Sequence, residues 1–96
     1  MSRPVRVFGW QGWRQECPAA RNGSHATREI CAAKSMAEVA RRTGKQRAAQ
    51  LFNLTETGNA VETAIAMNEP GIVFWSPLDQ FADRTWTRVP PHQEDR

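Results

Sequence analysis

The stretch SMAEVARRTG (residues 35–44) carries the signals for both ends of a short helix, and the rest of the fold is read outward from it. Ser35 belongs to the residue types that cap helices, and Glu38 follows three positions later, as in a capping box. Gly44 suits the left-handed position just past a helix end. The stretch therefore predicts a helix over residues 36–43.

A second stretch, NAVETAIAMNEPG (residues 59–71), has the same pattern of signals. Asn59 is a good cap, Glu62 stands three positions later, and a Pro-Gly pair ends the segment. These signals predict a helix over residues 60–68, with Glu62 facing outward. Its buried stripe is predicted to consist of Val61, Ala64, Ile65 and Asn68.

Strand patterns flank the two helices. Alternating or continuous apolar residues predict strands at 3–10, 27–33, 72–75 and 85–89. Residues 11–26 contain several Gly, Pro and Asn residues and predict a long loop. We therefore expect one small α+β domain over residues 1–89, in the order ββαβαβ. Both helices would cover one face of a mostly antiparallel sheet, and residues 90–96 would form a polar tail.

Residues 46–54 are ambiguous between a helix and a strand. The sequence QRAAQLF favours a helix, whereas LFNLT can form a strand. A helix here would make residues 35–54 a helix-turn-helix, because Ala40 and Gly44 have the spacing common in that motif. The alternative fold is therefore a helix-turn-helix with a β wing.

Charge is divided unevenly along the chain. Residues 1–47 hold 10 Lys/Arg and 3 Asp/Glu, a net of +7, and residues 48–96 hold 3 and 7, a net of −4. A basic half suits contact with the phosphates of duplex DNA. The competing interpretation is a solvated helix end whose cations favour the helix dipole. The candidate nucleic-acid-binding residues are Arg41, Arg42, Lys45, Gln46, Arg47 and Gln50.

A protein-interaction module is the alternative function. Exposed Trp residues anchor partners at many interfaces, and a bipolar surface suits a protein partner or self-association into a homo-oligomer. The candidate residues for this function are Trp10, Trp13, Glu62 and Glu69. For the two Trp residues, packing over the end of the sheet is the favoured interpretation.

Catalytic and metal-binding motifs have no clear counterpart in the sequence. The chain has no nucleophile elbow, no Gly-rich phosphate loop and no C-x-x-C pair. Cys17, His25 and Cys31 offer only three ligands at a spacing that matches no compact zinc pattern. No apolar run approaches the roughly 20 residues that span a bilayer. We therefore expect a protein that is not an enzyme, with no cofactor, no metal site and no membrane contact.

Three stretches resemble a known group of proteins. REICAAKS (residues 28–35), ETGN (56–59) and EPGIVFW (69–75) resemble small, mostly uncharacterised proteins encoded by mycobacteriophages and phages of related actinobacteria. The resemblance covers residues 28–78 and brings no catalytic motif. It implies a phage-encoded viral protein of unknown function that acts in the cytoplasm of the bacterial host, on DNA or on a host protein.

Overall fold

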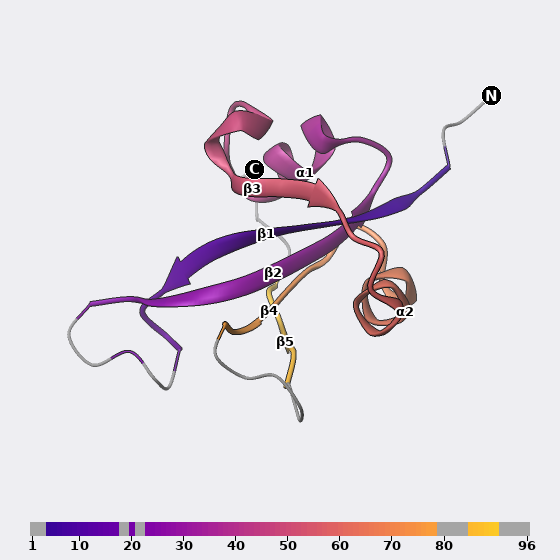
Figure 1. The fold of residues 1–96 in the computed structure, drawn as a ribbon. Helices are drawn as coiled ribbons and strands as arrows, with labels where there is room; N and C mark the ends of the chain where they lie inside the picture. Colours follow the sequence, from indigo (N-terminus) through magenta and orange to yellow (C-terminus); the bar gives the residue numbers. More distant parts are fainter. Residues whose placement is uncertain (1–3, 18–19, 21–22, 79–84, 91–96) are drawn as a thin grey trace.

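The fold is a five-stranded antiparallel sheet with two α-helices (Figure 1). In the computed structural model, residues 4–17, 20, 23–78 and 85–90 are described. The strands have the order β3-β1-β2-β4-β5 in the sheet. Their bounds are β1 Arg6–Arg14, β2 His25–Ala33, β3 Phe52–Glu56, β4 Val73–Pro77 and β5 Thr87–Arg88. The predicted α+β class and element order are therefore confirmed.

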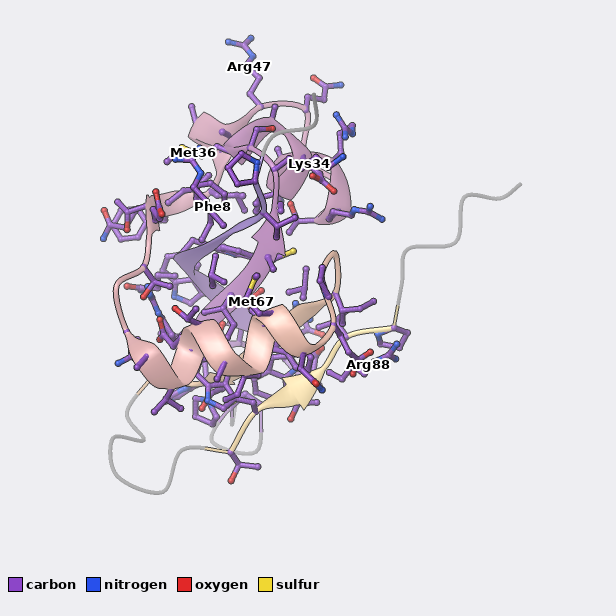
Figure 2. All side chains as sticks on the ribbon, turned by 90° about the vertical axis from the view of Figure 1, so that its right-hand side faces the viewer. Phe8, Lys34, Met36, Arg47, Met67 and Arg88 are labelled. Atoms are coloured by element: carbon purple, nitrogen blue, oxygen red, sulfur yellow. The ribbon has the colours of Figure 1, made fainter. Side chains whose placement is uncertain are left out.

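The two helices, α1 (Met36–Arg42) and α2 (Ala60–Asn68), lie on opposite faces of the sheet (Figure 2). Phe8, Cys31 and Val73 pack with Val39 of α1 on one face. Val7, Ile30 and Phe74 pack with Ala66 of α2 on the other. The expectation that both helices cover one face is wrong, because the central strands are apolar on both sides and each face needs its own cover.

The first helix ends as the sequence predicts. Ser35 Oγ accepts a hydrogen bond from the Glu38 N–H at 3.2 Å. The Glu38 carboxylate accepts from the Lys34 N–H at 2.8 Å, one residue earlier than a standard capping box would place this bond. At the other end Gly44 has φ +80°, and the Lys45 N–H donates to Ala40 O at 2.8 Å. These bonds satisfy both ends of a helix of only seven residues.

The second helix has the predicted bounds but a different buried face. Val61 is 64% exposed, whereas Glu62 and Ala66 are buried. Glu62 is buried because its carboxylate accepts two hydrogen bonds from Arg28 of β2, each 2.9 Å long. The prediction of an outward-facing Glu62 is therefore wrong, since a charged partner in the sheet turns the helix by about one position.

Residues 46–54 form no second helix of a helix-turn-helix. A short 3₁₀ helix, η1 (Ala48–Gln50), is followed at once by strand β3, which pairs with β1. Leu51, the residue that joins η1 to β3, is buried in the core. The helix-turn-helix alternative is therefore excluded, because pairing of β3 to the edge of the sheet outweighs the local helical propensity.

The predicted long loop is also shorter than expected. Residues 11–14 continue β1 and pair in register with residues 25–28 of β2. Gly12 sits inside the strand opposite Thr27. A Cβ atom on Gly12 would lie 2.5 Å from Glu29 Oε2, so the glycine leaves room for the Glu29 carboxylate above β1. Gly12 therefore permits the close approach of the Glu29 side chain and does not mark a turn.

Candidate functional site

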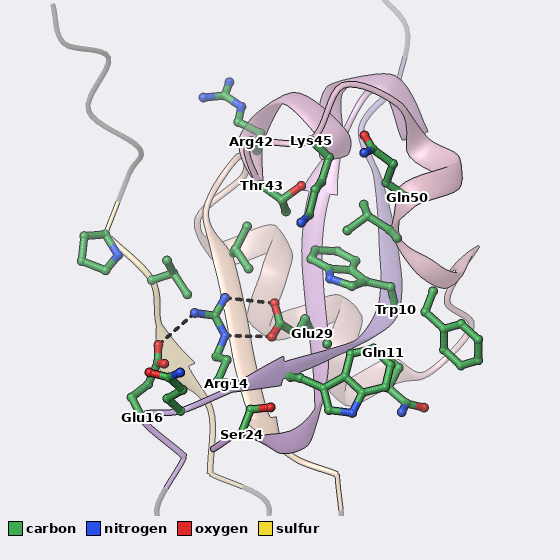
Figure 3. A pocket seen from close by; sticks show the side chains of 18 residues that line it. Trp10, Gln11, Arg14, Glu16, Ser24, Glu29, Arg42, Thr43, Lys45 and Gln50 are labelled. Carbon is green, nitrogen blue, oxygen red and sulfur yellow. Dashed lines mark hydrogen bonds and ion pairs between the residues drawn. The ribbon is translucent and has the colours of Figure 1, made fainter. Parts of the chain in front are cut away.

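A pocket of about 750 Å³ opens on the face of the sheet that carries α1 (Figure 3). Helix α1 packs over one end of this face, where Phe8, Cys31 and Ala33 are buried. The other end of the face, toward the β1–β2 turn, is not covered by α1. The pocket occupies this region, between the segment that joins α1 to β3 and the far ends of β1 and β2.

An arginine–glutamate pair lies at one side of the pocket. Arg14 Nε and Nη2 donate to the two carboxylate oxygens of Glu29, at 2.7 and 3.0 Å (Figure 3). Thr27 Oγ1 donates to Glu29 Oε2 at 2.8 Å, and Arg14 Nη1 also reaches Glu16. Burial opposes the charge of Arg14, but the hydrogen bonds and charge of Glu29 and Glu16 outweigh it and raise the pKa of Arg14. The bidentate pair neutralises the Glu29 carboxylate within the site.

Three aromatic residues of β1 and β3 border the pocket, and their side chains lie on different faces of the sheet. Trp10 is only 2% exposed, which agrees with the interpretation that it packs over the sheet and rules it out as a free anchor for a partner. Trp13 and Phe52 are each 53% exposed, and their ring centroids are 5.9 Å apart. The two rings are tilted by 53° and form an exposed apolar patch on the face of the sheet opposite the Arg14–Glu29 pair.

The charges in the described residues separate into a paired set and an unpaired set. Each of the six described carboxylates makes an ion pair, and these pairs use five arginines: Arg6, Arg14, Arg28, Arg42 and Arg88. The four remaining described cations make no ion pair with the described part of the chain. They are Lys34, Arg41, Lys45 and Arg47, all exposed, and all within residues 34–47, hereafter the cationic segment.

The cationic segment lies at the α1 end of the molecule. Figure 2 shows Lys34 and Arg47 near α1, on the side of the sheet opposite α2, which carries Met67. The segment also borders the pocket, because Lys45 lines it and its ammonium end points toward Trp10 (Figure 3). The unpaired positive charge and the pocket are therefore adjacent.

The candidate nucleic-acid-binding residues differ in their surroundings. Arg42 pairs with Glu38 on the same helix at 3.2 Å and so is partly neutralised. Gln46 is exposed, and its N–H donates to Gln50 Oε1 at 2.8 Å. Gln50 Oε1 also accepts from the Arg47 N–H at 3.0 Å. Without a recognition helix, the two glutamines hold the η1 turn together, and they are not presented in a groove-reading array.

The candidate acidic residues for a protein partner are already engaged. Glu62 is 8% exposed and is held by Arg28 and by Thr57 Oγ1, which donates at 2.8 Å. Glu69 is half-buried and pairs with Arg88 at 2.8 Å. Glu62 therefore fastens α2 to the sheet, and the exposed member of the proposed interaction set is Trp13.

The three residues considered as metal ligands do not come together. Cys17 Sγ lies 3.7 Å from His25 Nδ1, but Cys31 is packed against α1 with Val39 and Val73. Burial raises the pKa of the Cys31 thiol to about 11. Among the described residues, no group of three or more His, Cys, Asp or Glu side chains is arranged to hold a metal ion.

Sequence reasoning did not find the Arg14–Glu29 pair or the role of Phe52. Arg14 and Glu29 are 15 positions apart, and Arg14 was placed inside the predicted loop of residues 11–26. Phe52 was not among the candidate residues, and β3 places it at the surface beside Trp13.

No known protein family, curated protein or solved structure matches this chain. The resemblance to phage proteins therefore stays a prediction. No helix in the described residues is long and apolar enough to cross a bilayer.

Proposed function

We propose that this protein is a non-catalytic DNA-binding protein that contacts backbone phosphates through the cationic segment. The proposal rests on one observation, which is that the cations without an ion pair are confined to one segment of the described chain. Every described carboxylate is paired, and the four described cations left without an ion pair all lie within residues 34–47. Exposed Lys and Arg side chains that make no ion pair are the groups that exchange counterions for phosphates.

The acidic second half of the chain does not oppose this proposal. Of its seven acidic residues, Glu56, Glu62 and Glu69 are described, and each is neutralised by an arginine. Glu62 and Glu69 also belong to the α2 side, away from the cationic segment. Repulsion of DNA at the α1 end by these two groups is therefore weak, and the charge of Glu56 is offset by Arg6.

The mode of binding differs from the one that the sequence suggested. With η1 in place of a recognition helix, Gln46 and Gln50 have no helix to carry them into the major groove. The proposal is therefore contact with phosphates, which positions a protein on DNA without reading its sequence. In a phage-encoded protein, as the resemblance implies, the DNA would be that of the phage or of the bacterial host.

A titration of fluorescently labelled DNA duplex by anisotropy tests the proposal. Four phosphate contacts predict a loss of affinity of about a hundredfold between roughly 50 and 200 mM salt. The double variant Arg41→Ala/Arg47→Ala should shrink that loss to about tenfold, because two contacts are gone. The matched control is Arg6→Ala/Arg88→Ala, which removes two exposed cations that are already ion-paired. Absence of binding at low salt, or equal effects of the two variants, would reject the proposal.

A second candidate function, a protein-interaction module that captures a host protein or a second copy of the chain, is supported by one observation. The exposed pair of Trp13 and Phe52 lies next to β3, which is an edge strand of the sheet. Edge strands and exposed aromatic rings are both common in interfaces. Light scattering after size exclusion tests the self-association form: a monomeric mass at every concentration and salt excludes it.

A further inference from the structure

We infer that two copies of the chain form a symmetric dimer, in which β3 of one copy pairs antiparallel with β3 of the other. The inference goes beyond DNA binding. It names the partner and the surface for the self-association form of the second candidate function, and it rests on that form alone. Three features of the β3 edge favour a second copy: its free backbone groups, its self-complementary register and the apolar side chains at its two ends.

The outer edge of β3 offers backbone groups to a further strand. β3 pairs with β1 on one side, and no strand of the described chain pairs with its other side. The Thr57 N–H donates to Val7 O of β1 at 2.9 Å, so the backbone groups of Thr57, and by alternation those of Thr55, point toward β1. The N–H and C=O groups of Leu54 and Glu56 therefore point outward, where an added strand would bond to them.

This edge is complementary to itself. When two outward-pointing residues face each other across an antiparallel pair, Leu54 of each copy lies opposite Glu56 of the other. Thr55 then faces Thr55 of the second copy at the two-fold axis, and opposed threonines are a favourable cross-strand pair. No like charges meet, because Glu56 faces a leucine and is already paired with Arg6.

A bulge at the start of β3 limits the strand pair to a few residues. The register shifts between Gly9 and Gln11 of β1, where Asn53 of β3 has φ +60°. The bulge turns Phe52 to the α2 face, beside Trp13. Since a bulge also shortens the free edge, apolar contacts have to add to the strand pairing in a stable dimer.

Exposed apolar side chains lie on the α2 face at both ends of β3. Phe52 and Trp13 lie at its start, and Val61 lies beyond its end, in the first turn of α2. Helix α2 begins near the β3 edge, because only residues 57–59 link the two elements (Figure 1). Antiparallel pairing therefore brings Phe52 and Trp13 of each copy next to Val61 of the other, and it buries surface that a single copy exposes to water.

Light scattering after size exclusion, over a series of protein concentrations, tests the inference. The wild type should reach twice the mass of one chain. Thr55→Lys and Thr55→Glu should each stay monomeric, because like charges then meet at the two-fold axis. An equimolar mixture of the two variants should recover the dimer, since opposite charges meet there instead. The matched control Thr87→Lys places the same charge at an exposed threonine of β5, the opposite edge strand, and should dimerise as the wild type does.

Two truncations test the apolar contacts, and they keep the test valid if a charge at position 55 unfolds the chain. Phe52→Ala and Val61→Ala should each weaken the dimer by about tenfold or more. Met67→Ala, which removes an exposed apolar side chain farther along α2, should leave the dimer unchanged.

The possible failures are distinguishable. A dimer that survives Thr55→Lys and both truncations would overturn the inference and leave self-association to another surface. A monomeric mass at every concentration would reject the inference together with the self-association form. DNA binding is tested separately by Arg41→Ala/Arg47→Ala and stands or falls on that result.

Discussion

The two faces of the sheet carry similar arginine–glutamate pairs, but α2 closes one face at its pair, whereas the pocket leaves the other face open at its pair. On each face an arginine–glutamate pair lies above a glycine of β1, and a threonine donates to the glutamate. The pair Arg28–Glu62 lies above Gly9 on the α2 face, and Arg14–Glu29 lies above Gly12 on the α1 face. The two pairs differ in the structural element that carries the glutamate.

Glu62 comes from helix α2, so its pair with Arg28 joins two layers of the fold and closes that face. Glu29 comes from β2, next to the strand of Arg14, so its pair stays within the sheet and holds no element above it. The end of the face around Arg14 is therefore left open as the pocket. The comparison indicates that one pair is used for stability and the other shapes a surface.

The largest effect is expected from removal of the Glu62 charge. Glu62→Gln leaves the Arg28 guanidinium partly buried without its carboxylate and weakens the attachment of α2. We expect the free energy of unfolding, measured in urea, to fall by about 3 kcal/mol. Glu29→Gln should cost less, about 1–2 kcal/mol, because Arg14 keeps Glu16 and an open pocket for water.

Glu69→Gln serves as the control for these two variants. It removes the carboxylate of the exposed pair with Arg88 and should cost less than about 1 kcal/mol. If Glu62→Gln and Glu69→Gln destabilise the protein equally, the structural role assigned to the Arg28–Glu62 pair is wrong.

A smaller effect is expected at the two glycines. A Cβ on Gly9 would collide with the Arg28 guanidinium, and a Cβ on Gly12 would collide with the Glu29 carboxylate. Gly9→Ala should therefore lower stability by about 1–3 kcal/mol through displacement of Arg28 from Glu62. Gly12→Ala should cost less stability but should displace the Glu29 carboxylate and alter the pocket. The reverse order, with Gly12→Ala the more destabilising, would contradict the comparison of the faces.

The smallest effect on the free energy of unfolding is expected at Glu38 of α1, where it depends on pH. The hydrogen bond from the Lys34 N–H, followed by the contact with Arg42, lowers the pKa of Glu38. A lowered folded-state pKa gives stability that is complete above the ordinary value of about 4.3 and is lost as the pH falls through the folded-state value. The difference in unfolding free energy between wild type and Glu38→Gln should therefore shrink with acidification. A difference that does not change with pH would show that ionised Glu38 contributes nothing.

The sequence predicted local signals well and long-range pairing poorly. The caps at Ser35 and Asn59, the glycine at position 44 and the apolar strand around Val73 all lie where their patterns placed them. Each of these signals depends on neighbours within a few residues. The burial of Glu62 and the course of residues 46–54 depend on Arg28 and on the edge of β1, which are distant in sequence.

The same reason limits prediction of the candidate site. The basic residues at 41–47 were evident as a run, but their lack of acidic partners follows only from the ion pairs made elsewhere. Trp10 and Trp13 are three positions apart in one strand, yet one is buried and the other exposed. Residues three apart in a strand point to opposite faces of the sheet, so Trp10 is covered by Leu51 on the α1 face, whereas Trp13 lies on the other face beside Phe52.

The most direct test of the account is an NMR titration of the ¹⁵N-labelled protein with a DNA duplex at low salt. The account predicts that amide shifts change along residues 34–47, while those of α2, Ala60–Asn68, stay in place. Shifts concentrated on α2, or spread evenly over both faces, would contradict the assignment of binding to the α1 face.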